Sequence, residues 1–289
     1  MYGTTEVLAV RRGDHQLYAE LTPGSGPPVI LLHGFPDNIH LYDRLVPHLA
    51  GGAAVVRFDF LGWGRSDKPR GYPYTATNQT GDIEAVVAAL ASRQDARKVV
   101  LVAHDASGPP AIDWALANPE RVAALVLLNT YYHWTPGLRR PPAIALYSTP
   151  GIRAVARALV RRRPDLDRRL YHWQVGGFIA DPAVRQELVP RLYEQFLPAR
   201  PAFWRLNDDL LRAVFSRRAR IPELRRFQPP VRVIFGTLDR YLNPRVAKGF
   251  AATFPHSELH LLADAGHYVQ VDAPAEVARL ISAPVASGN

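Results

Sequence analysis

The stretch that most constrains the fold is residues 99–108, where four consecutive aliphatic residues run directly into Ala-His-Asp-Ala-Ser-Gly. A continuous apolar run bounded by small residues is typical of a strand buried on both faces of a parallel sheet. Small residues follow Asp105, and the next apolar residues recur at helical spacing. The sequence therefore predicts a sharp turn from strand to helix, a nucleophile elbow, with a carboxylate at its apex.

The rest of the chain alternates strands and helices. Apolar and polar residues alternate over residues 6–21 around Gly13-Asp14, which predicts an antiparallel hairpin. Further buried strands are expected at residues 28–32, 53–60 and 122–128, and two more strands at residues 231–235 and 258–262, the last of them short. Helices are expected at residues 41–49, 82–91, 245–254 and 275–281. This alternation predicts a doubly wound, mostly parallel sheet, because each parallel crossover needs a helix to return the chain.

Residues 132–226 interrupt this alternation. They are rich in Arg, Pro and aromatic residues, contain no convincing buried strand, and are expected to form several short helices. We therefore expect an α/β core made of residues 1–131 and 227–289, with residues 132–226 inserted as a helical cap. Such an insert lies over the carboxyl ends of the strands, where ligands of these sheets bind.

The net charge of +9 raises the question of a nucleic-acid partner. Seventeen arginines and seven acidic residues lie within residues 132–220, whereas the rest of the chain carries 18 basic and 19 acidic residues. The arginines are interspersed with aliphatic and acidic residues and lack an RNA or DNA motif, so we interpret them as a solvated helical surface. The expectation is no nucleic-acid partner.

No apolar run in the sequence approaches the roughly 20 residues needed to cross a bilayer, and the first twelve residues contain no apolar signal segment. We expect a cytoplasmic protein with no membrane partner. The chain has no cysteine, which excludes disulfides and thiolate chemistry. Neither a metal nor an organic cofactor is implied, and the sequence does not indicate an oligomeric state.

A carboxylate nucleophile needs an electrophile and a base that activates water for the second half-reaction. Asp239 and His267 each follow the end of a predicted strand, so both should lie at the same sheet edge as Asp105. Asp239 could orient His267, and His267 could face Asp105. Taken alone, Asp239 is equally compatible with a turn or helix cap. The three together, in the order nucleophile, acid, histidine, predict a catalytic triad.

With these residues in place, the chain resembles an α/β-hydrolase of the aspartate-nucleophile branch, which includes epoxide hydrolases, haloalkane dehalogenases and haloacetate dehalogenases. The resemblance covers about residues 5 to 283 and is stronger in the core than in the cap. The sequence HGFP at residues 33–36 matches the HGxP motif of the family. This match implies that the backbone N–H groups of Phe35 and Ala106 form the oxyanion hole.

Two further positions follow from the resemblance. Residues 59–67 match the glycine-rich loop of the family, which we interpret as a tight turn that supports the site. Asn129 stands where one dehalogenase subgroup carries its catalytic acid, so Asp239 remains the expected acid.

Ser107 is the alternative nucleophile, because most hydrolases of this fold use serine. The elbow needs a small residue two positions after the nucleophile. For Ser107 that residue is Pro109, which also fixes φ where the turn needs freedom. Asp105 is therefore preferred.

The resemblance leaves the leaving group open. Haloalkane dehalogenases usually bind the halide through a Trp directly after the nucleophile and an Asn or second Trp, where this chain has Ala106 and Phe35. Haloacetate dehalogenases place arginines just after the nucleophile, and this chain does not. Epoxide hydrolases usually protonate the epoxide oxygen from two lid tyrosines. Candidate leaving-group stabilisers are therefore Tyr147, Tyr193, Trp173 and Trp204, with Tyr131, Tyr132 and Tyr171 as further tyrosines.

The resemblance thus implies a hydrolase that acts on a small molecule through a covalent alkyl ester of Asp105. An epoxide hydrolase that converts epoxides to vicinal diols is the favoured interpretation, because HGxP is the common form of the motif in that group. A haloalkane or haloacid dehalogenase is the alternative. A ligand-binding protein on a degenerate hydrolase fold is a further alternative, and the intact triad argues against it.

Overall fold

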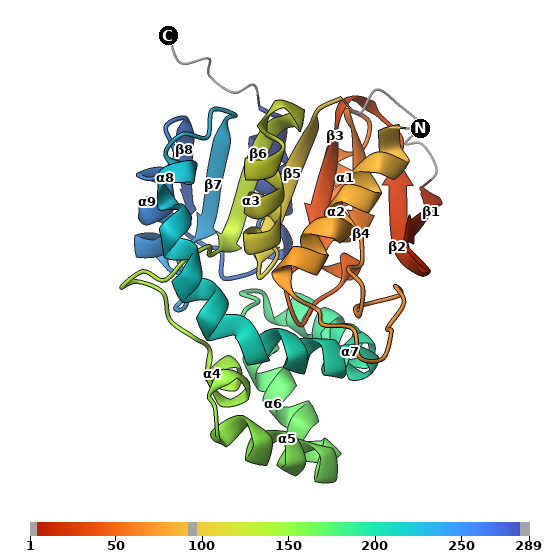
Figure 1. The fold of residues 1–289 in the computed structure, drawn as a ribbon, viewed down its shortest axis with the longest axis vertical. Helices are drawn as coiled ribbons and strands as arrows, with labels where there is room; N and C mark the ends of the chain where they lie inside the picture. Colours follow the sequence, from red (N-terminus) through yellow and green to blue (C-terminus); the bar gives the residue numbers. More distant parts are fainter. Residues whose placement is uncertain (1–4, 92–96, 284–289) are drawn as a thin grey trace.

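The computed structural model describes residues 5–91 and 97–283, and its centre is an eight-stranded sheet (Figure 1). In order of pairing the strands are β1 (Glu6–Arg12), β2 (His15–Thr22), β4 (Ala53–Phe58), β3 (Ser25–Leu32), β5 (Val99–Asp105), β6 (Val122–Thr130), β7 (Val231–Gly236) and β8 (Ser257–Leu262). β2 pairs antiparallel with β1 and β4, and every pair from β4 to β8 is parallel. The predicted doubly wound, mostly parallel sheet and its opening hairpin are confirmed.

The helices outside residues 132–226 flank the sheet. They are η1 (Ile39–Tyr42), α1 (Val46–Leu49), α2 (Ala76–Ala91), α3 (Gly108–Ala117), η2 (Pro119–Arg121), α9 (Pro244–Ala251), α10 (Val269–Asp272) and α11 (Pro274–Ser282). The single helix expected at residues 41–49 is wrong: two short helices occupy the stretch, because Pro47 fits the first turn of a helix but not its interior. α2 begins six residues earlier than expected, since the Thr75 hydroxyl accepts a hydrogen bond from the Asn78 N–H at 3.3 Å and caps the first turn.

The hydrophobic core surrounds the central strands. β5 and β6 are almost entirely buried, and their aliphatic side chains pack between helices on both faces. Burial on both faces explains why these strands are continuous apolar runs in the sequence and do not alternate. The carboxyl end of β5 is therefore a rigid platform for Asp105.

Residues 132–226 contain helices and no strand: α4 (Pro142–Ser148), α5 (Ile152–Arg162), α6 (Pro164–Gly176), α7 (Pro182–Ser216), η3 (Arg217–Arg220) and α8 (Ile221–Leu224). α4 to α7 lie beyond the carboxyl ends of the parallel strands, with α7 running along the sheet edge (Figure 1). The expectation of only short helices is wrong, because α7 has 35 residues and continues through Pro190, Pro198 and Pro201. Each proline removes one helical N–H bond, which bends a packed helix without ending it.

Candidate active site

The elbow after β5 has the strained backbone that its sequence predicts. Asp105 has a φ of +48°, in the left-handed region that residues with a side chain rarely adopt. The Thr130 hydroxyl donates to the Asp105 carbonyl oxygen and holds this conformation. A Cβ at Gly108 would lie 1.9 Å from the Thr130 hydroxyl oxygen, so only glycine fits where the helix begins.

Ser107 faces away from the site. Its buried hydroxyl accepts a hydrogen bond from the His104 N–H at 2.9 Å and lies within donor distance of the carbonyl oxygens of Leu32 (2.8 Å) and His104 (2.7 Å). It ties β5 to β3. This hydroxyl therefore supports the elbow, and Asp105 is the side chain at the apex.

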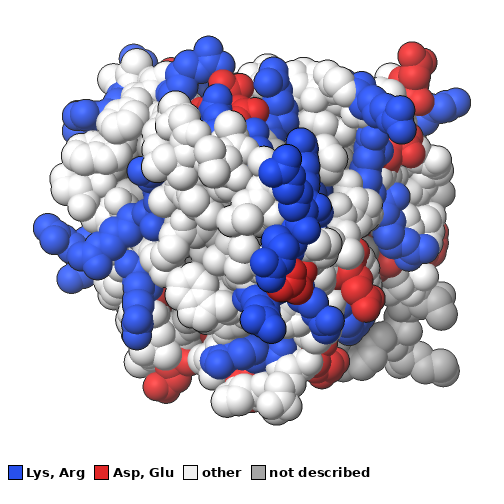
Figure 2. Space-filling model, turned by 90° about the horizontal axis from the view of Figure 1, so that it is seen from below, with Lys and Arg blue, Asp and Glu red and all other residues white. Residues whose placement is uncertain are grey.

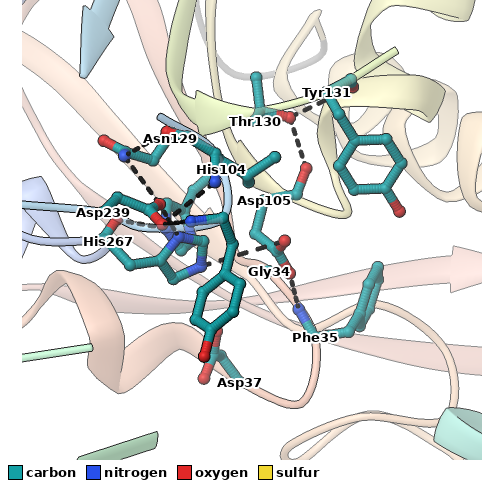
Figure 3. Close-up of polar contacts among 12 residues, drawn as sticks. Gly34, Phe35, Asp37, His104, Asp105, Asn129, Thr130, Tyr131, Asp239 and His267 are labelled. Atoms are coloured by element: carbon teal, nitrogen blue, oxygen red, sulfur yellow. Dashed lines mark hydrogen bonds and ion pairs between the residues drawn. The ribbon is translucent and has the colours of Figure 1, made fainter. Parts of the chain in front are cut away.

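Two backbone N–H groups face the Asp105 carboxylate (Figure 3). The Phe35 N–H donates to Oδ2 at 3.2 Å, and the Ala106 N–H also hydrogen-bonds to this carboxylate. These are the two groups expected to form the oxyanion hole. A Cβ at Gly34 would lie 2.7 Å from the Asp105 Cβ, so glycine is required for this close approach.

His33 holds in place the loop that carries the Phe35 N–H group. The Phe60 N–H donates to His33 Nε2 at 3.3 Å, so the proton lies on Nδ1, which donates to the Gly34 carbonyl oxygen at 2.7 Å. Burial lowers the pKa of His33 and keeps the ring neutral. The glycine-rich loop is tied in through Asp59, whose carboxylate accepts hydrogen bonds from the N–H groups of Ile39 and Arg65. This loop supports the site and is not part of the cavity lining.

His267 lies between two carboxylates (Figure 3). Its Nδ1 is 2.7 Å from Asp239 Oδ2, and its Nε2 is 4.0 Å from Asp105 Oδ1. Asp239 Oδ1 accepts the N–H groups of Tyr241 (2.8 Å) and Leu242 (3.1 Å). The structure thus brings together the three residues that the sequence analysis selected. Asp239 orients the ring so that Nε2 points at the Asp105 carboxylate.

Asn129 supports the acid and does not replace it. Its Nδ2 donates to Asp239 Oδ2 at 3.0 Å and to the Leu242 carbonyl oxygen at 3.3 Å, while its Oδ1 accepts the Gly236 N–H at 2.8 Å. Asn129 thereby links the end of β6 to the Asp239 loop after β7. Sequence reasoning could not assign this role, because all three partners lie more than a hundred residues away.

Neighbouring charges and burial shift the pKa values of the three site residues in opposite directions. Burial raises the pKa of Asp105, although His267 and the two N–H groups favour its ionised form. Burial also opposes ionisation of Asp239, but His267 and the hydrogen bonds outweigh it and lower the pKa of Asp239. Burial alone would lower the pKa of His267, yet the neighbouring carboxylates of Asp239, Asp105 and Asp37 raise it.

Asp37 is a third carboxylate that the sequence analysis missed. It is buried, lines the same cavity as Asp105, and accepts a hydrogen bond from the Tyr268 hydroxyl at 2.7 Å. Burial, reinforced by the Asp105 charge, raises the pKa of Asp37 to about 7. The available signal was its position, directly after the HGFP motif.

A cavity of about 380 Å³ lies above Asp105, between the sheet edge and the cap. Asp105, Ala106, Phe35 and His267 line its floor. Most of the cap residues around it are apolar or aromatic, and they come from α4, α6, α7 and the segments before α4 and after α6; Arg139 and Arg140 also line it. Asp167 also lines it and is paired with Arg200. In the described part of the chain, no group of three or more His, Asp or Glu side chains could hold a metal ion.

The candidate leaving-group stabilisers lie in different places. Tyr147 lines the cavity, whereas Tyr193, Trp173 and Trp204 are not among its lining residues. The Tyr193 hydroxyl donates to Asp167 Oδ2 at 3.3 Å, and Trp173 is 61% exposed. The Trp204 ring packs under the guanidinium groups of neighbouring arginines.

The further tyrosines also lie in different places. Tyr131 and Tyr171 line the cavity, whereas the Tyr132 hydroxyl donates to Asp113 Oδ1 at 2.7 Å. Figure 3 shows the Tyr131 ring beside Asp105, on the side away from His267. Among the described residues the buried Tyr171 hydroxyl has no hydrogen-bond partner, and burial together with the Asp37 charge raises its pKa well above the ordinary value. Helical position separates Tyr171 from Trp173, because neighbouring residues on α6 point in different directions.

Residues 27–274 match the α/β-hydrolase fold family. The chain is 27% identical over 271 residues to a cis-3-alkyl-4-alkyloxetan-2-one decarboxylase of Shewanella oneidensis, with 89% of this chain and 81% of that protein covered. It is 30% identical over 279 residues to a haloalkane dehalogenase of Mycobacterium marinum, with 92% and 87% covered. Among solved structures, Cfl2 of Burkholderia cenocepacia shares the fold, with a TM-score of 0.79, 18% identity, and 96% and 94% covered.

Because the family match spans most of the chain, the protein belongs to the α/β-hydrolase fold family. Within that family it is an enzyme of the branch that contains dehalogenases and epoxide hydrolases, since its dehalogenase relatives align over nearly their whole length. No helix within residues 5–91 and 97–283 has the length and hydropathy to cross a membrane.

Proposed function

We propose that the protein is an epoxide hydrolase in which Asp105 opens the ring and the Tyr171 hydroxyl protonates the departing oxygen. The observation that carries this proposal is the Tyr171 hydroxyl, which is buried and has no hydrogen-bond partner among the described residues, on a residue that lines the same cavity as Asp105. A buried hydroxyl without a partner is costly unless a ligand satisfies it. Tyr147 lines the cavity as a second donor.

In the first half-reaction, Asp105 Oδ1 forms a bond to a ring carbon, and the bond from that carbon to the epoxide oxygen breaks. The oxygen takes the tyrosine proton and becomes a hydroxyl group. Oδ2 stays at the N–H group of Phe35 and becomes the carbonyl oxygen of the ester. The raised pKa of Tyr171 suits a group that must carry its proton until the leaving oxygen becomes basic.

In the second half-reaction, neutral His267 takes a proton from a water molecule, which attacks the ester carbon of Asp105. Its Nε2 lies 4.0 Å from Oδ1, too far for a direct hydrogen bond and suited to a water between them. The N–H groups of Phe35 and Ala106 stabilise the tetrahedral oxyanion. The ester bond then breaks, and the departing alkoxide takes the proton from His267, which completes the diol. The proton that remains on the Asp105 carboxyl group passes to the Tyr171 oxygen, so that Asp105 is again a carboxylate and Tyr171 again a phenol.

The lining of the cavity argues for oxygen over halide as the leaving group. A halide is best stabilised by indole or amide N–H donors, but Ala106 follows the nucleophile, and Trp173 and Trp204 are not in the lining. Among the lining residues the indole is that of Trp134, which is partly exposed to solvent. The amides are those of Gln174, whose Oε1 accepts the Ala143 N–H, and Asn207, whose Nδ2 donates to the Phe203 carbonyl oxygen.

Haloalkane dehalogenation is the second candidate, because several relatives at 26–30% identity are haloalkane dehalogenases. The relative from Shewanella oneidensis is named for an oxetan-2-one, which is also a strained ring containing a carbon–oxygen bond. A four-membered lactone therefore belongs in the substrate panel beside epoxides and bromoalkanes.

The test is a panel of aryl and alkyl epoxides, 1-bromoalkanes and cis-3,4-dialkyloxetan-2-ones, with diol, bromide and carbon dioxide as the products measured. We expect diol formation, and about a 100-fold lower kcat on epoxides in the Tyr171→Phe variant, the effect of losing one general acid. Tyr193→Phe is the matched control from the same cap, with a much smaller expected effect. Bromide or carbon dioxide without diol would contradict the epoxide assignment.

A further inference from the structure

Helix α5 presents aliphatic side chains to solvent. Ile152, Val155 and Leu159 are 52%, 71% and 48% exposed, and their spacing places them on one face of the helix. Single exposed aliphatic residues are ordinary, but a row of three along one helix marks an interaction surface. We call these three residues the aliphatic row.

The arginines on the inner side of α5 explain why this row faces outward. Arg153 and Arg157 form ion pairs with Asp208 of α7 at 3.1 and 3.0 Å. Arg157 also donates to the Trp204 carbonyl oxygen at 2.8 Å. These contacts fix the rotation of α5 about its axis. The outward direction of the aliphatic row is therefore built into the packing of the cap.

Positive charge accompanies the aliphatic row. Exposed arginines lie at the C-terminal end of α5, between the two helices, and on α6; they are Arg161, Arg162, Arg163, Arg168 and Arg169. Arg163 pairs with Asp165 at 2.9 Å, but within the described chain Arg162, Arg168 and Arg169 have no carboxylate at ion-pair distance. Figure 2 shows this end of the molecule, where blue side chains border a broad uncharged area and outnumber the red ones.

We propose that α5 docks the cap onto an anionic lipid surface. The aliphatic row would enter the boundary between headgroups and acyl chains, and the arginines would bind lipid phosphates, as in other basic amphipathic helices. A second copy of the chain fits this face poorly, because a two-fold interface would bring the same arginines together. α5 forms the end of the molecule farthest from the sheet, so a flat surface can reach it (Figure 1).

This proposal revises the expectation of no membrane partner. That expectation rested on the lack of a spanning segment, which surface docking does not need. The basic segment interpreted as a solvated surface becomes, on this view, the lipid-facing side of the cap. The proposal does not depend on which substrate the active site takes.

The test is co-sedimentation of the full chain with vesicles of phosphatidylcholine alone and of phosphatidylcholine with phosphatidylglycerol. We expect binding to the anionic vesicles only, and weaker binding as salt is raised. The Val155→Gln/Leu159→Gln and Arg162→Gln/Arg169→Gln variants should each bind about tenfold more weakly. Val7→Gln is the matched control, because Val7 is 63% exposed on β1, far from α5.

Three results would overturn the proposal. The first is a wild-type protein that stays in the supernatant with anionic vesicles. The second is equal binding by the wild type, both double variants and Val7→Gln, or equal binding to neutral vesicles. The third is concentration-dependent self-association in sedimentation velocity that Val155→Gln/Leu159→Gln abolishes, which would assign the face to a second copy. Unchanged circular dichroism and thermal midpoints confirm that the variants fold.

Discussion

Replacing Asp37 with asparagine should stabilise the protein, and by an amount that grows with pH. Asp37 is buried, and its pKa of about 7 in the folded chain compares with 3.8 for an ordinary aspartate. The folded state therefore holds this proton more tightly than the unfolded state does. Below about pH 4 both states are protonated and the carboxyl costs nothing; as the pH rises towards 7, the unfolded chain ionises first and the free energy of unfolding falls.

The structure sets the size of this effect. Each pH unit between the two pKa values is worth about 1.4 kcal/mol, so the full penalty above pH 7 approaches about 4 kcal/mol. Asparagine keeps an oxygen that accepts the Tyr268 hydroxyl and carries no charge. Between about pH 5 and about pH 8, the stability advantage of Asp37→Asn over the wild type should grow by about 3 kcal/mol.

The assay is urea unfolding of the wild type and Asp37→Asn at both pH values, with Asp14→Asn in the exposed β1–β2 turn as the control. A pH-dependent gain of the same size in Asp14→Asn would mean that the effect is not specific to Asp37. An Asp37→Asn advantage that does not change with pH would refute the argument, because it would mean that Asp37 ionises as easily in the folded chain as in the unfolded one.

Three further predictions follow from the site. Gly34→Ala should lower kcat/KM of the folded protein at least about 100-fold, because its Cβ would lie 2.7 Å from the Asp105 Cβ. An enzyme of normal activity would contradict the close approach of the two loops. Ser107→Ala should cost about 1–3 kcal/mol in urea unfolding and leave kcat of the folded fraction near normal, whereas loss of turnover in folded protein would favour a serine nucleophile. Because neutral His267 is the base and its pKa is raised, kcat should rise with pH, with a midpoint above 6.5. Asp37→Asn should move this midpoint to lower pH. A midpoint that stays in place would mean that Asp37 does not act on His267.

The sequence was sufficient for the α/β layers and for the strand-end residues. Asp105 ends β5, whose buried apolar run is unambiguous, and Asp239 and His267 follow β7 and β8, which resume the alternation of strands and helices along the chain. The geometry of parallel strands then brings these residues to one edge. The helical character of residues 132–226 could also be predicted, but the length of α7 could not, because prolines usually end helices and here tertiary packing carries the helix through three of them.

The roles that escaped prediction depend on contacts between distant residues or on the rotation of a helix. Asn129 supports Asp239 across the site, and Asp37 acquires its raised pKa only because the fold buries it, next to the Asp105 charge. In the cap, the direction of each aromatic side chain depends on how α6 is rotated. The sequence could name Tyr171 and Trp173 as candidates, but only the packed structure places the first in the cavity and the second in solvent.

The central claim is that Asp105 forms a covalent ester that His267 helps water to break, and intact mass spectrometry of His267→Gln incubated with substrate tests it most directly. With an epoxide, the protein should gain the whole mass of the substrate; with a haloalkane, the gain would be the substrate less hydrogen halide. Peptide mapping should place the adduct on Asp105, and His267→Gln/Asp105→Ala should gain nothing. An unmodified His267→Gln protein on every substrate that the wild type turns over, or an Asp105→Ala variant with normal turnover, would contradict the mechanism.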